Sequence, residues 1–461
     1  MSLMNRMKIV LADKPFIRRT AAIAMPIALQ NLLNTALNFV DTLMIGRLGE
    51  SSIAAVGLAN KVFFVFTLFV FGIVSGSGVL TAQYWGRRDV PNIRRVLGIS
   101  LVLSLFAAFL FLIPSVLSPE FVMRIFTTEA DTIAIGAEYL IIVAVSYPFT
   151  AVTTAYVALL RGVNRVKAPV VITTIAILVN VVFNYLLIFG KFGFPELGVA
   201  GAAIATLIAR IVECSSLLVL VYLSKSPAAA KLKELFDFNK GFLDKYFRTV
   251  TPVIANEFMW GLGVTLYSLA YGRMGKAAVA AITITQTVEQ IMTVLFMGIS
   301  NATAVILGNE MGAGHLKDAE DHAKSLILIQ MLLTMLMAVI GFFARDGIIM
   351  MFAVSPQVAH DFKLCLLAFI LYMPFKMFNF INVVGILRSG GDTKACLFLD
   401  CTGVWFIGIP MAFIGGLFLH FPIYIVYAMV MIEEIYKFTL GLIRYRQKKW
   451  LRNIVSDVMV S

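Results

Sequence analysis

Long apolar runs alternate along the chain with short segments that hold most of its charges. Many of the runs exceed the roughly 20 residues that a helix needs to cross about 30 Å of hydrocarbon. None shows the alternation of apolar and polar residues that is typical of outer-membrane barrel strands. The pattern predicts an all-α polytopic membrane protein with twelve transmembrane helices, at about 20–45, 53–82, 97–117, 133–160, 168–190, 198–223, 247–272, 279–308, 323–344, 361–387, 395–418 and 422–443.

Composition and charge agree with this pattern. The chain is 60% hydrophobic, against roughly 45–50% in soluble domains, and has a mean hydropathy of +0.90. Lysine and arginine gather before the first span, in alternate loops and after the last span, which predicts that both termini are cytoplasmic. The net charge of +12 then reflects basic loops beside membrane lipids rather than a nucleic-acid partner. We expect a multi-pass protein of the cell membrane without a cleavable signal peptide.

The sequence offers no pattern for an enzyme, a metal site or a cofactor. The four cysteines fall within or beside predicted spans without CxxC spacing, and the four histidines do not cluster. No nucleotide loop, HExxH or GxSxG motif occurs. A membrane-embedded enzyme is therefore the disfavoured alternative, and no cofactor is expected.

An internal repeat organises the chain. The stretch that begins at Met25 lies over the stretch that begins at Thr251 without a gap, so that Pro26 falls on Pro252. Later, Leu160-Arg161 falls on Leu387-Arg388 after a shift of a single residue. The repeat predicts two pseudo-twofold-related six-helix bundles, 1–223 and 246–461, joined by a polar and basic cytoplasmic linker at 224–245.

Two bundles related by a parallel repeat are typical of carriers that open a central cleft to each side in turn. A channel with the same symmetry more often has a pore loop or repeated polar rings, and the sequence shows neither. The repeat therefore favours a carrier.

Several motifs resemble the multidrug and toxic compound extrusion (MATE) family over nearly the whole chain. They are "DTLMIGRLG", "AAVGLAN", "TAQYWGRRD", "NYLLIFG" and "GILRSGGDTK", in this order along the chain. The resemblance implies a transporter that exports small organic, often cationic, compounds in exchange for protons or sodium ions, and we expect a monomer. The nearest alternative is a lipid-linked oligosaccharide flippase of the same superfamily, which would need a strongly cationic cleft for diphosphate.

Asp41 is the strongest functional candidate. It shares a helix face with Asn34 and Asn38, and Gln30 extends this face by one more turn. Asn34 and Asn38 fit a polar seam between helices or a cleft equally well. A carboxylate differs, because a charge at bilayer depth costs at least about 2.5–3.5 kcal/mol and a seam does not require one. The resemblance also implies an aspartate at this position.

The fifth span supplies amides to the same site. Asn180 and Asn184 are four residues apart on one helix face, and Thr173 lies two turns earlier. The resemblance implies an acid where this chain has Asn184, and an asparagine cannot titrate. We expect Asp41, Asn180 and Asn184 to couple the cation, and Thr173 to lie in the cleft.

The second half contributes weaker candidates. Glu257 and Glu289 are candidates for a second cation site, although either can instead pair with an inward-facing cation or with water. Met259 and Met292 are candidates for a flexible substrate surface, although a lipid-facing position or core packing is favoured for each residue taken singly. Pro26 bends its helix and is the candidate hinge. The expected structural pairs are Arg210 with Glu213, Glu433 with Lys437 and Lys376 with Asp400.

Overall fold

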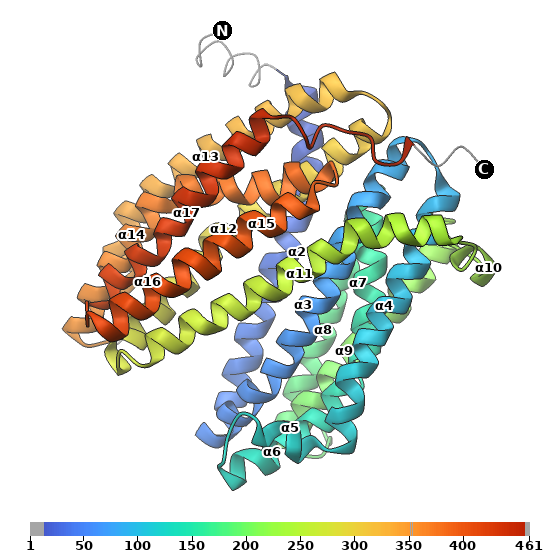
Figure 1. Ribbon diagram of the computed structural model, residues 1–461. Coiled ribbons are helices and arrows are strands. Elements are labelled where there is room, and N and C mark those ends of the chain that lie inside the picture. Colours follow the sequence, from blue (N-terminus) through green and yellow to red (C-terminus); the bar gives the residue numbers. More distant parts are fainter. Residues whose placement is uncertain (1–12, 351, 353, 457–461) are drawn as a thin grey trace. The chain divides into compact units, whose positions relative to one another are not determined.

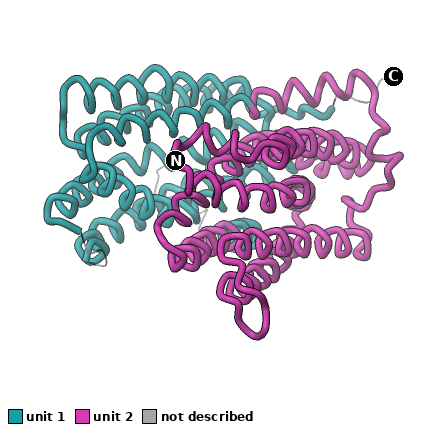
Figure 2. Tube along the Cα trace, turned by 90° about the horizontal axis from the view of Figure 1, so that it is seen from below, with its two compact units in different colours: residues 1–28, 255–461 teal, residues 29–254 magenta. Residues whose placement is uncertain are grey.

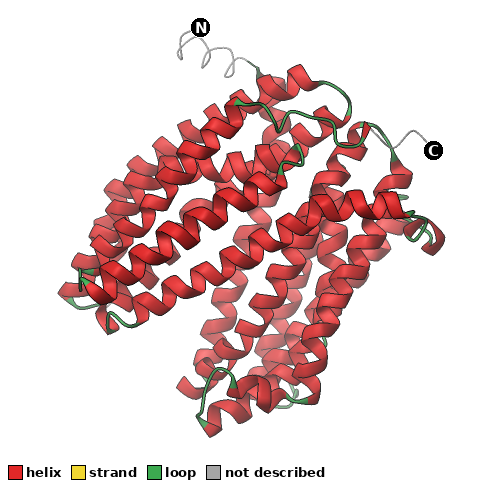
Figure 3. Ribbon diagram, in the orientation of Figure 1, coloured by secondary structure: helices red, strands yellow, loops and turns green. Residues whose placement is uncertain are grey.

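The computed structural model describes residues 13–350, 352 and 354–456, and all regular elements within them are helical (Figure 1 and Figure 3). Each of the twelve predicted spans coincides with a helix or with consecutive helical segments. The fold class predicted from the sequence, an all-α polytopic membrane protein, is therefore confirmed.

The described residues divide into two compact units, which are coloured separately in Figure 2. Unit 1 comprises residues 1–28 and 255–461, and unit 2 comprises residues 29–254. Unit 2 holds the second part of α2 (Lys14–Gly46), then α3 (Glu50–Gly86), α4 (Val90–Leu117), α5 (Pro119–Arg124), α6 (Ala130–Ala144), α7 (Tyr147–Gly162), α8 (Lys167–Phe189), α9 (Gly198–Leu223), α10 (Leu232–Leu235) and the first part of α11 (Lys240–Gly272).

Unit 1 holds the remaining parts of α2 and α11. Its other helices are α12 (Lys276–Gly312), α13 (Leu316–Met350), α14 (Pro356–Phe380), α15 (Thr393–Gly403), α16 (Ile409–Phe413) and α17 (Ile423–Arg446), with π-helical segments η1 (Ile381–Leu387), η2 (Val404–Gly408) and η3 (Ile414–Phe418). The segments from α15 to η3 follow one another without a loop.

Length and composition separate the twelve spans into two groups. Nine of the described helical stretches, and the bent pair α6–α7, are apolar enough to cross a membrane by that measure alone. The other two, α11 and α17, carry Glu257 and the group Glu433, Glu434 and Lys437. All four side chains are buried inside unit 1, where they form ion pairs. Pairing lets a charged helix stay within the bundle.

Two helices belong to both units. α2 passes from unit 1 to unit 2 after Ala28, and α11 passes from unit 2 to unit 1 after Ile254. Each crossing follows a proline, Pro26 or Pro252, by two residues. A proline inside a helix removes a backbone hydrogen bond, so each crossing lies at the locally weakened part of its helix.

Glycines let the first part of α11 pack closely on α3 within unit 2. A Cβ atom at Gly76 would lie 2.9 Å from the Cα atom of Val250. One residue further along α3, the Ser77 hydroxyl is 2.7 Å from the Tyr246 hydroxyl. The α3–α11 contact therefore depends on the absence of a side chain at Gly76.

The segment between the halves is ordered and packs on unit 2. Its short helix α10 contacts α4, where Arg94 donates to Glu234 at 2.6 Å. Arg95 pairs with Asp237 at the same distance. Two arginines in the first turns of α4 and the acids of this segment thus hold it against the bundle.

Replacing Gly76 by alanine tests the α3–α11 contact. The new methyl group would collide with backbone atoms of α11, and overpacking of this kind costs about 1–3 kcal/mol. We expect a lower thermal denaturation midpoint for the purified protein. The matched control is Gly78→Ala on the same helix, because a Cβ atom there meets no atom within 4 Å. Equal midpoints for the two variants would contradict the contact.

Candidate functional site

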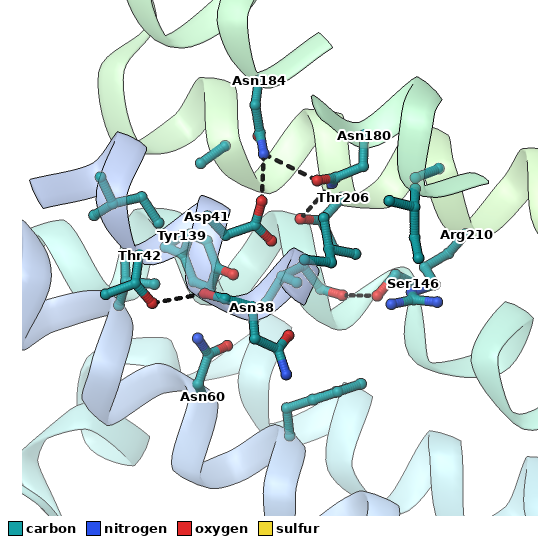
Figure 4. Close-up of a pocket in the computed structure, with 18 of the residues that line it drawn as sticks. Asn38, Asp41, Thr42, Asn60, Tyr139, Ser146, Asn180, Asn184, Thr206 and Arg210 are labelled. Atoms are coloured by element: carbon teal, nitrogen blue, oxygen red, sulfur yellow. Dashed lines mark hydrogen bonds between the residues drawn. The ribbon is translucent and has the colours of Figure 1, made fainter. Parts of the chain in front are cut away.

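A cavity of about 510 Å³ lies within unit 2, enclosed by α2, α3, α6, α8 and α9 (Figure 4). Its polar and charged lining residues are Asn38, Asp41, Thr42, Asn60, Thr67, Tyr139, Ser146, Thr173, Asn180, Asn184, Thr206 and Arg210. Apolar lining includes Phe63 and Phe64 of α3. The cavity therefore combines an apolar wall with a few polar groups, as small-molecule sites commonly do.

Asp41 is held by amides of α8. The side-chain nitrogen of Asn184 donates to Asp41 Oδ1 at 2.6 Å and to Asn180 Oδ1 at 3.0 Å. The nitrogen of Asn180 in turn lies 3.4 Å from the Thr206 hydroxyl on α9. Figure 4 shows these side chains converging from three helices. The four-residue spacing of Asn180 and Asn184 brings the two amides to one face of α8, as the sequence predicts.

A second line of buried polar groups runs beside the cavity. Arg161 donates to Gln30 at 2.6 Å, and the Gln30 nitrogen donates to the Thr173 hydroxyl at 2.9 Å. That hydroxyl donates to Glu213 at 2.9 Å, and Glu213 pairs with Arg210 at 2.6 Å. The expected Arg210–Glu213 pair is thus present, and the line joins α2, α7, α8 and α9.

The charges of the cavity are unequally compensated. Asp41 and Arg210 are the charged side chains among the described lining residues. Arg210 is neutralised by Glu213, whose side chain is only 6% exposed. In the described part of the chain, no salt bridge joins Asp41 to a base, and its bonded partner is the neutral Asn184. When Asp41 is ionised, the cavity therefore carries one net negative charge.

The predicted candidates of the first span separate by one helical turn. Asn38 and Asp41 line the cavity, whereas Gln30 is buried in the polar line and Asn34 is outside the lining. Gln30 therefore bonds other helices instead of facing the cavity. On this helix face, Gln30 belongs to a polar seam between helices, whereas Asn38 faces the cavity.

Sequence reasoning missed three residues that surround Asp41. Asn60, Tyr139 and Thr206 line the cavity from α3, α6 and α9. Asn60 and Tyr139 belong to no helical stripe of polar residues, so periodicity gives no signal for them. Thr206 precedes Arg210 and Glu213 at i, i+4 and i+7, and this spacing is the signal that could have found it. Arg210 was recognised only as half of a structural pair.

Both acids of the candidate second cation site bind bases. Glu257 accepts from Arg388 at 2.9 Å. Glu289 pairs with Lys376 and also accepts a hydrogen bond from the Tyr427 hydroxyl at 2.8 Å. Because each acid has its own basic partner, the structure does not bring the two together as ligands of one ion.

One expected pair is wrong. Lys376 bonds Glu289 of α12, and Asp400 accepts a hydrogen bond from Asn256 at 3.0 Å. The distribution of charges among spans could not indicate which face each helix turns to its neighbours. Within the described residues, no group of three His, Cys, Asp or Glu side chains is arranged to hold a metal ion.

The two candidate methionines occupy different environments. Met292 is 6% exposed and lies in the hydrophobic core of unit 1, where its methyl group approaches Gly341. Its predicted place at a substrate surface is therefore replaced by core packing. Met259 is partly buried, and its carbonyl accepts a hydrogen bond from the Trp405 indole at 3.2 Å.

Removing the Thr173 hydroxyl tests the polar line. Thr173→Val leaves the Gln30 nitrogen and a Glu213 oxygen without this partner, and each unsatisfied buried group costs about 1–3 kcal/mol. We expect a clear fall in the thermal denaturation midpoint. Thr174→Val is the matched control, because the Thr174 hydroxyl bonds only the Val170 carbonyl of its own helix. A fall no larger than the control's would exclude a stabilising role for the line.

Comparison with known proteins agrees with the internal repeat. The family model described as MatE matches the chain twice, over residues 26–186 and 252–414. The two matches begin at Pro26 and Pro252, the prolines that the repeat superimposes. Together they cover more than half of the chain.

Individual relatives are similar over almost their whole length. The chain is 25% identical to the uncharacterized transporter YisQ of Bacillus subtilis, over 96% of both chains. It is 24% identical to the probable multidrug resistance protein NorM of Thermotoga maritima, over 94% of this chain and 93% of that one. A structure described as the outward-facing conformation of a multidrug resistance MATE family transporter of the MOP superfamily matches with a TM-score of 0.84 and 18% identity, over 95% and 97% of the chains. The chain belongs to the MatE family of multidrug efflux transporters.

Proposed function

We propose that this MatE-family protein exports small organic cations in exchange for protons, with Asp41 as the coupling group. The observation that carries the proposal is the charge of the unit 2 cavity. Asp41 lines it without a basic partner in the described part of the chain, while its neighbour Arg210 is neutralised by Glu213. The cavity therefore gains or loses its net charge with a single proton.

Protonation and substrate binding then compete for the same carboxylate. A carboxylate removed from water favours its neutral form unless a cation compensates it. With Asp41 ionised, the cavity attracts an organic cation, and the aromatic rings of Phe63 and Phe64 offer an apolar surface for it. With Asp41 protonated, that attraction is lost and the cation leaves. Each ligand can shift the other only through its differential affinity for the two states.

The polarity of the cavity also distinguishes this function from a lipid-linked oligosaccharide flippase. A diphosphate needs several free cationic groups. The one basic side chain among the described lining residues, Arg210, is already bound to Glu213. Amides, hydroxyls and Asp41 make up the rest of the polar lining, which suits a cation better than an anion.

Alternating access needs a movement that depends on the state of Asp41. α2 carries both Asp41 and Pro26, and the helix passes from one unit to the other two residues after Pro26. Bending at this proline would change the angle between the parts of α2 before and after Pro26, while the contacts of Asp41 with α8 stay in place. Pro26 is therefore the proposed hinge.

Sodium is a second candidate for the coupling ion, supported by one specific observation. The Asn184 side-chain oxygen is buried and has no hydrogen-bond donor in the structure. With the oxygens of Asp41, Asn180 and Thr206 it belongs to a set of hard ligands that suits a small cation. The transport experiment below separates the two ions.

The protein is further proposed to act as a monomer with both termini in the cytoplasm. The 224–245 segment is rich in lysine, and its Lys233 side chain is exposed. In sealed cells that carry Lys233→Cys, we expect a membrane-impermeant thiol reagent to react only after the cells are opened. The unsubstituted protein is the control, because three of its four native cysteines are buried. Labelling of Lys233→Cys in intact cells would contradict the cytoplasmic position of this segment.

Asp41→Asn is expected to abolish coupled efflux. The amide keeps the shape of the side chain but cannot titrate or carry charge. In proteoliposomes with pH and sodium gradients imposed separately, a fluorescent lipophilic cation should move on the pH gradient with wild-type protein and stop with the variant. Folding should be nearly unchanged by thermal denaturation.

Glu138→Gln is the matched control, because it neutralises an exposed acid on α6 next to Tyr139 and should leave transport at the wild-type rate. Wild-type efflux by Asp41→Asn would reduce Asp41 to a structural residue. Efflux driven by the sodium gradient alone would assign the coupling to sodium.

A further inference from the structure

The internal repeat aligns the pocket-lining face of α9 with a charged face of α17. Three matched dipeptides keep one constant separation along the chain: Leu160-Arg161 with Leu387-Arg388, Lys167-Ala168 with Lys394-Ala395, and Phe194-Pro195 with Phe421-Pro422. In this register Thr206 corresponds to Glu433, and Arg210 corresponds to Lys437. In the register of the first spans, Asp41 corresponds to Tyr267.

The three residues of unit 2 line one cavity, and the corresponding residues of unit 1 are in direct contact. The Tyr267 hydroxyl donates to Glu433 Oε2 at 2.6 Å. The Lys437 ammonium lies 3.3 Å from an oxygen of Glu433 and 3.3 Å from an oxygen of Glu434. Asn379 donates to the Glu434 carboxylate at 2.8 Å. In unit 2 the acid is on the first helix of the repeat and the hydroxyl is on the last. In unit 1 the first helix carries the hydroxyl of Tyr267 and the last carries the acid Glu433.

Glycines on the covering helix make room for this cluster. A Cβ atom at Gly408 would lie 2.6 Å from Glu433 Oε2 and would also collide with the Tyr267 hydroxyl. A Cβ atom at Gly403 would lie 2.9 Å from the Lys437 side chain. The segments α15 and η2 are therefore shaped around the charged groups.

The cluster carries more negative than positive charge. Lys437 serves both Glu433 and Glu434, while the neighbouring Lys376 is bound to Glu289. Three carboxylates therefore face two ammonium groups.

The other titratable groups around the cluster add no positive charge to it. Tyr271 and Tyr427 are neutral, Asp400 adds an acid, and Arg388 is bound to Glu257. The side chains of Glu433, Glu434 and Lys437 are at most 7% exposed, so water cannot compensate the excess charge.

We propose that Glu433 holds a proton, so that unit 1 contains a second proton-binding site at the position that corresponds to the Asp41 cavity. The carboxylate takes up one proton from the solvent, and the net charge of Glu289, Glu433, Glu434, Lys376 and Lys437 then becomes zero. The proton belongs to Glu433 because its other partner is the neutral Tyr267, whereas Glu434 also receives the Asn379 amide and the field of Lys376.

A proton fits this site better than a metal ion does. Lys437 already occupies the space between the two carboxylates, so a larger cation would have to displace it. The Asn379 side-chain oxygen is buried, 5% exposed as a residue, and has no donor in the structure, while its nitrogen bonds Glu434.

The site does not depend on the role proposed for Asp41 and goes beyond it. It also differs from the acids that the sequence suggested for unit 1, because Glu257 and Glu289 have basic partners of their own. An exporter with such a site would carry protonatable groups in both units, with Asp41 open to its cavity and Glu433 closed from water.

Infrared spectroscopy of purified full-length protein tests the proposal. In the Asp41→Asn background at neutral pH, we expect the carbonyl stretch of a protonated carboxylic acid, shifted by exchange into D2O. Adding Glu433→Gln should remove the intensity of one acid. Adding Lys437→Met should have the opposite effect, because the loss of a base leaves a further carboxylate to be protonated.

Asp361→Asn in the same background is the matched control, because Asp361 is another buried acid of unit 1, on α14, and its loss should leave the Glu433 intensity in place. An absent band in the Asp41→Asn protein would overturn the proposal. Unchanged intensity after Glu433→Gln, in protein that elutes as a folded species, would also overturn it.

Discussion

A charge inside the membrane must be neutralised by a neighbour, and this requirement organises both units. In unit 2, hydrogen bonds join Arg161, Gln30, Thr173, Glu213 and Arg210 into one line, in which Glu213 neutralises Arg210. Asp41 lies beside this line and bonds only a neutral amide in the described part of the chain. Because Glu213 neutralises Arg210, the Asp41 carboxylate is not paired with that arginine. An acid already paired with arginine would have little affinity for a proton or for an organic cation.

The two halves share a helical scaffold but distribute their acids differently. The position of Asp41 on the first helix of the repeat is a tyrosine in the second half, and the position of Thr206 on the last helix is a glutamate. Lysine replaces arginine at the position of Arg210. Unit 2 surrounds its acid with a cavity, whereas unit 1 surrounds the corresponding group with glycine-bearing helix and excludes water. The polar positions of the repeat thus correspond in the two units, whereas Asp41 lines a cavity and the Glu433 side chain is only 7% exposed.

The sequence predicted the spans and the repeat because hydropathy and helical periodicity act along one chain segment. The grouping of Asp41 with Asn184 came from the family resemblance. The sequence could not predict contacts that depend on the rotation of one helix against another. The predicted partner of Lys376 was therefore wrong, and Thr206 was not recognised as a lining residue. Met292, a candidate for the substrate surface, lies in the core. Single polar residues in apolar spans give no pattern, and only the three-dimensional structure shows which of them face the same cavity.

Two helices, α2 and α11, contribute to both units. The first part of α2 is fixed in unit 1, where Ala24 and Ala28 approach Gly298 so closely that a Cβ atom there would clash. The second part is fixed in unit 2 through Asp41. Pro26 lies within the part that is fixed in unit 1, between Ala24 and Ala28, and removes one backbone hydrogen bond of α2. In α11, Pro252 lies between Tyr246, which bonds Ser77 in unit 2, and Tyr267, which bonds Glu433 in unit 1. Each helix that contributes to both units therefore has a proline two residues before the position at which it passes from one unit to the other.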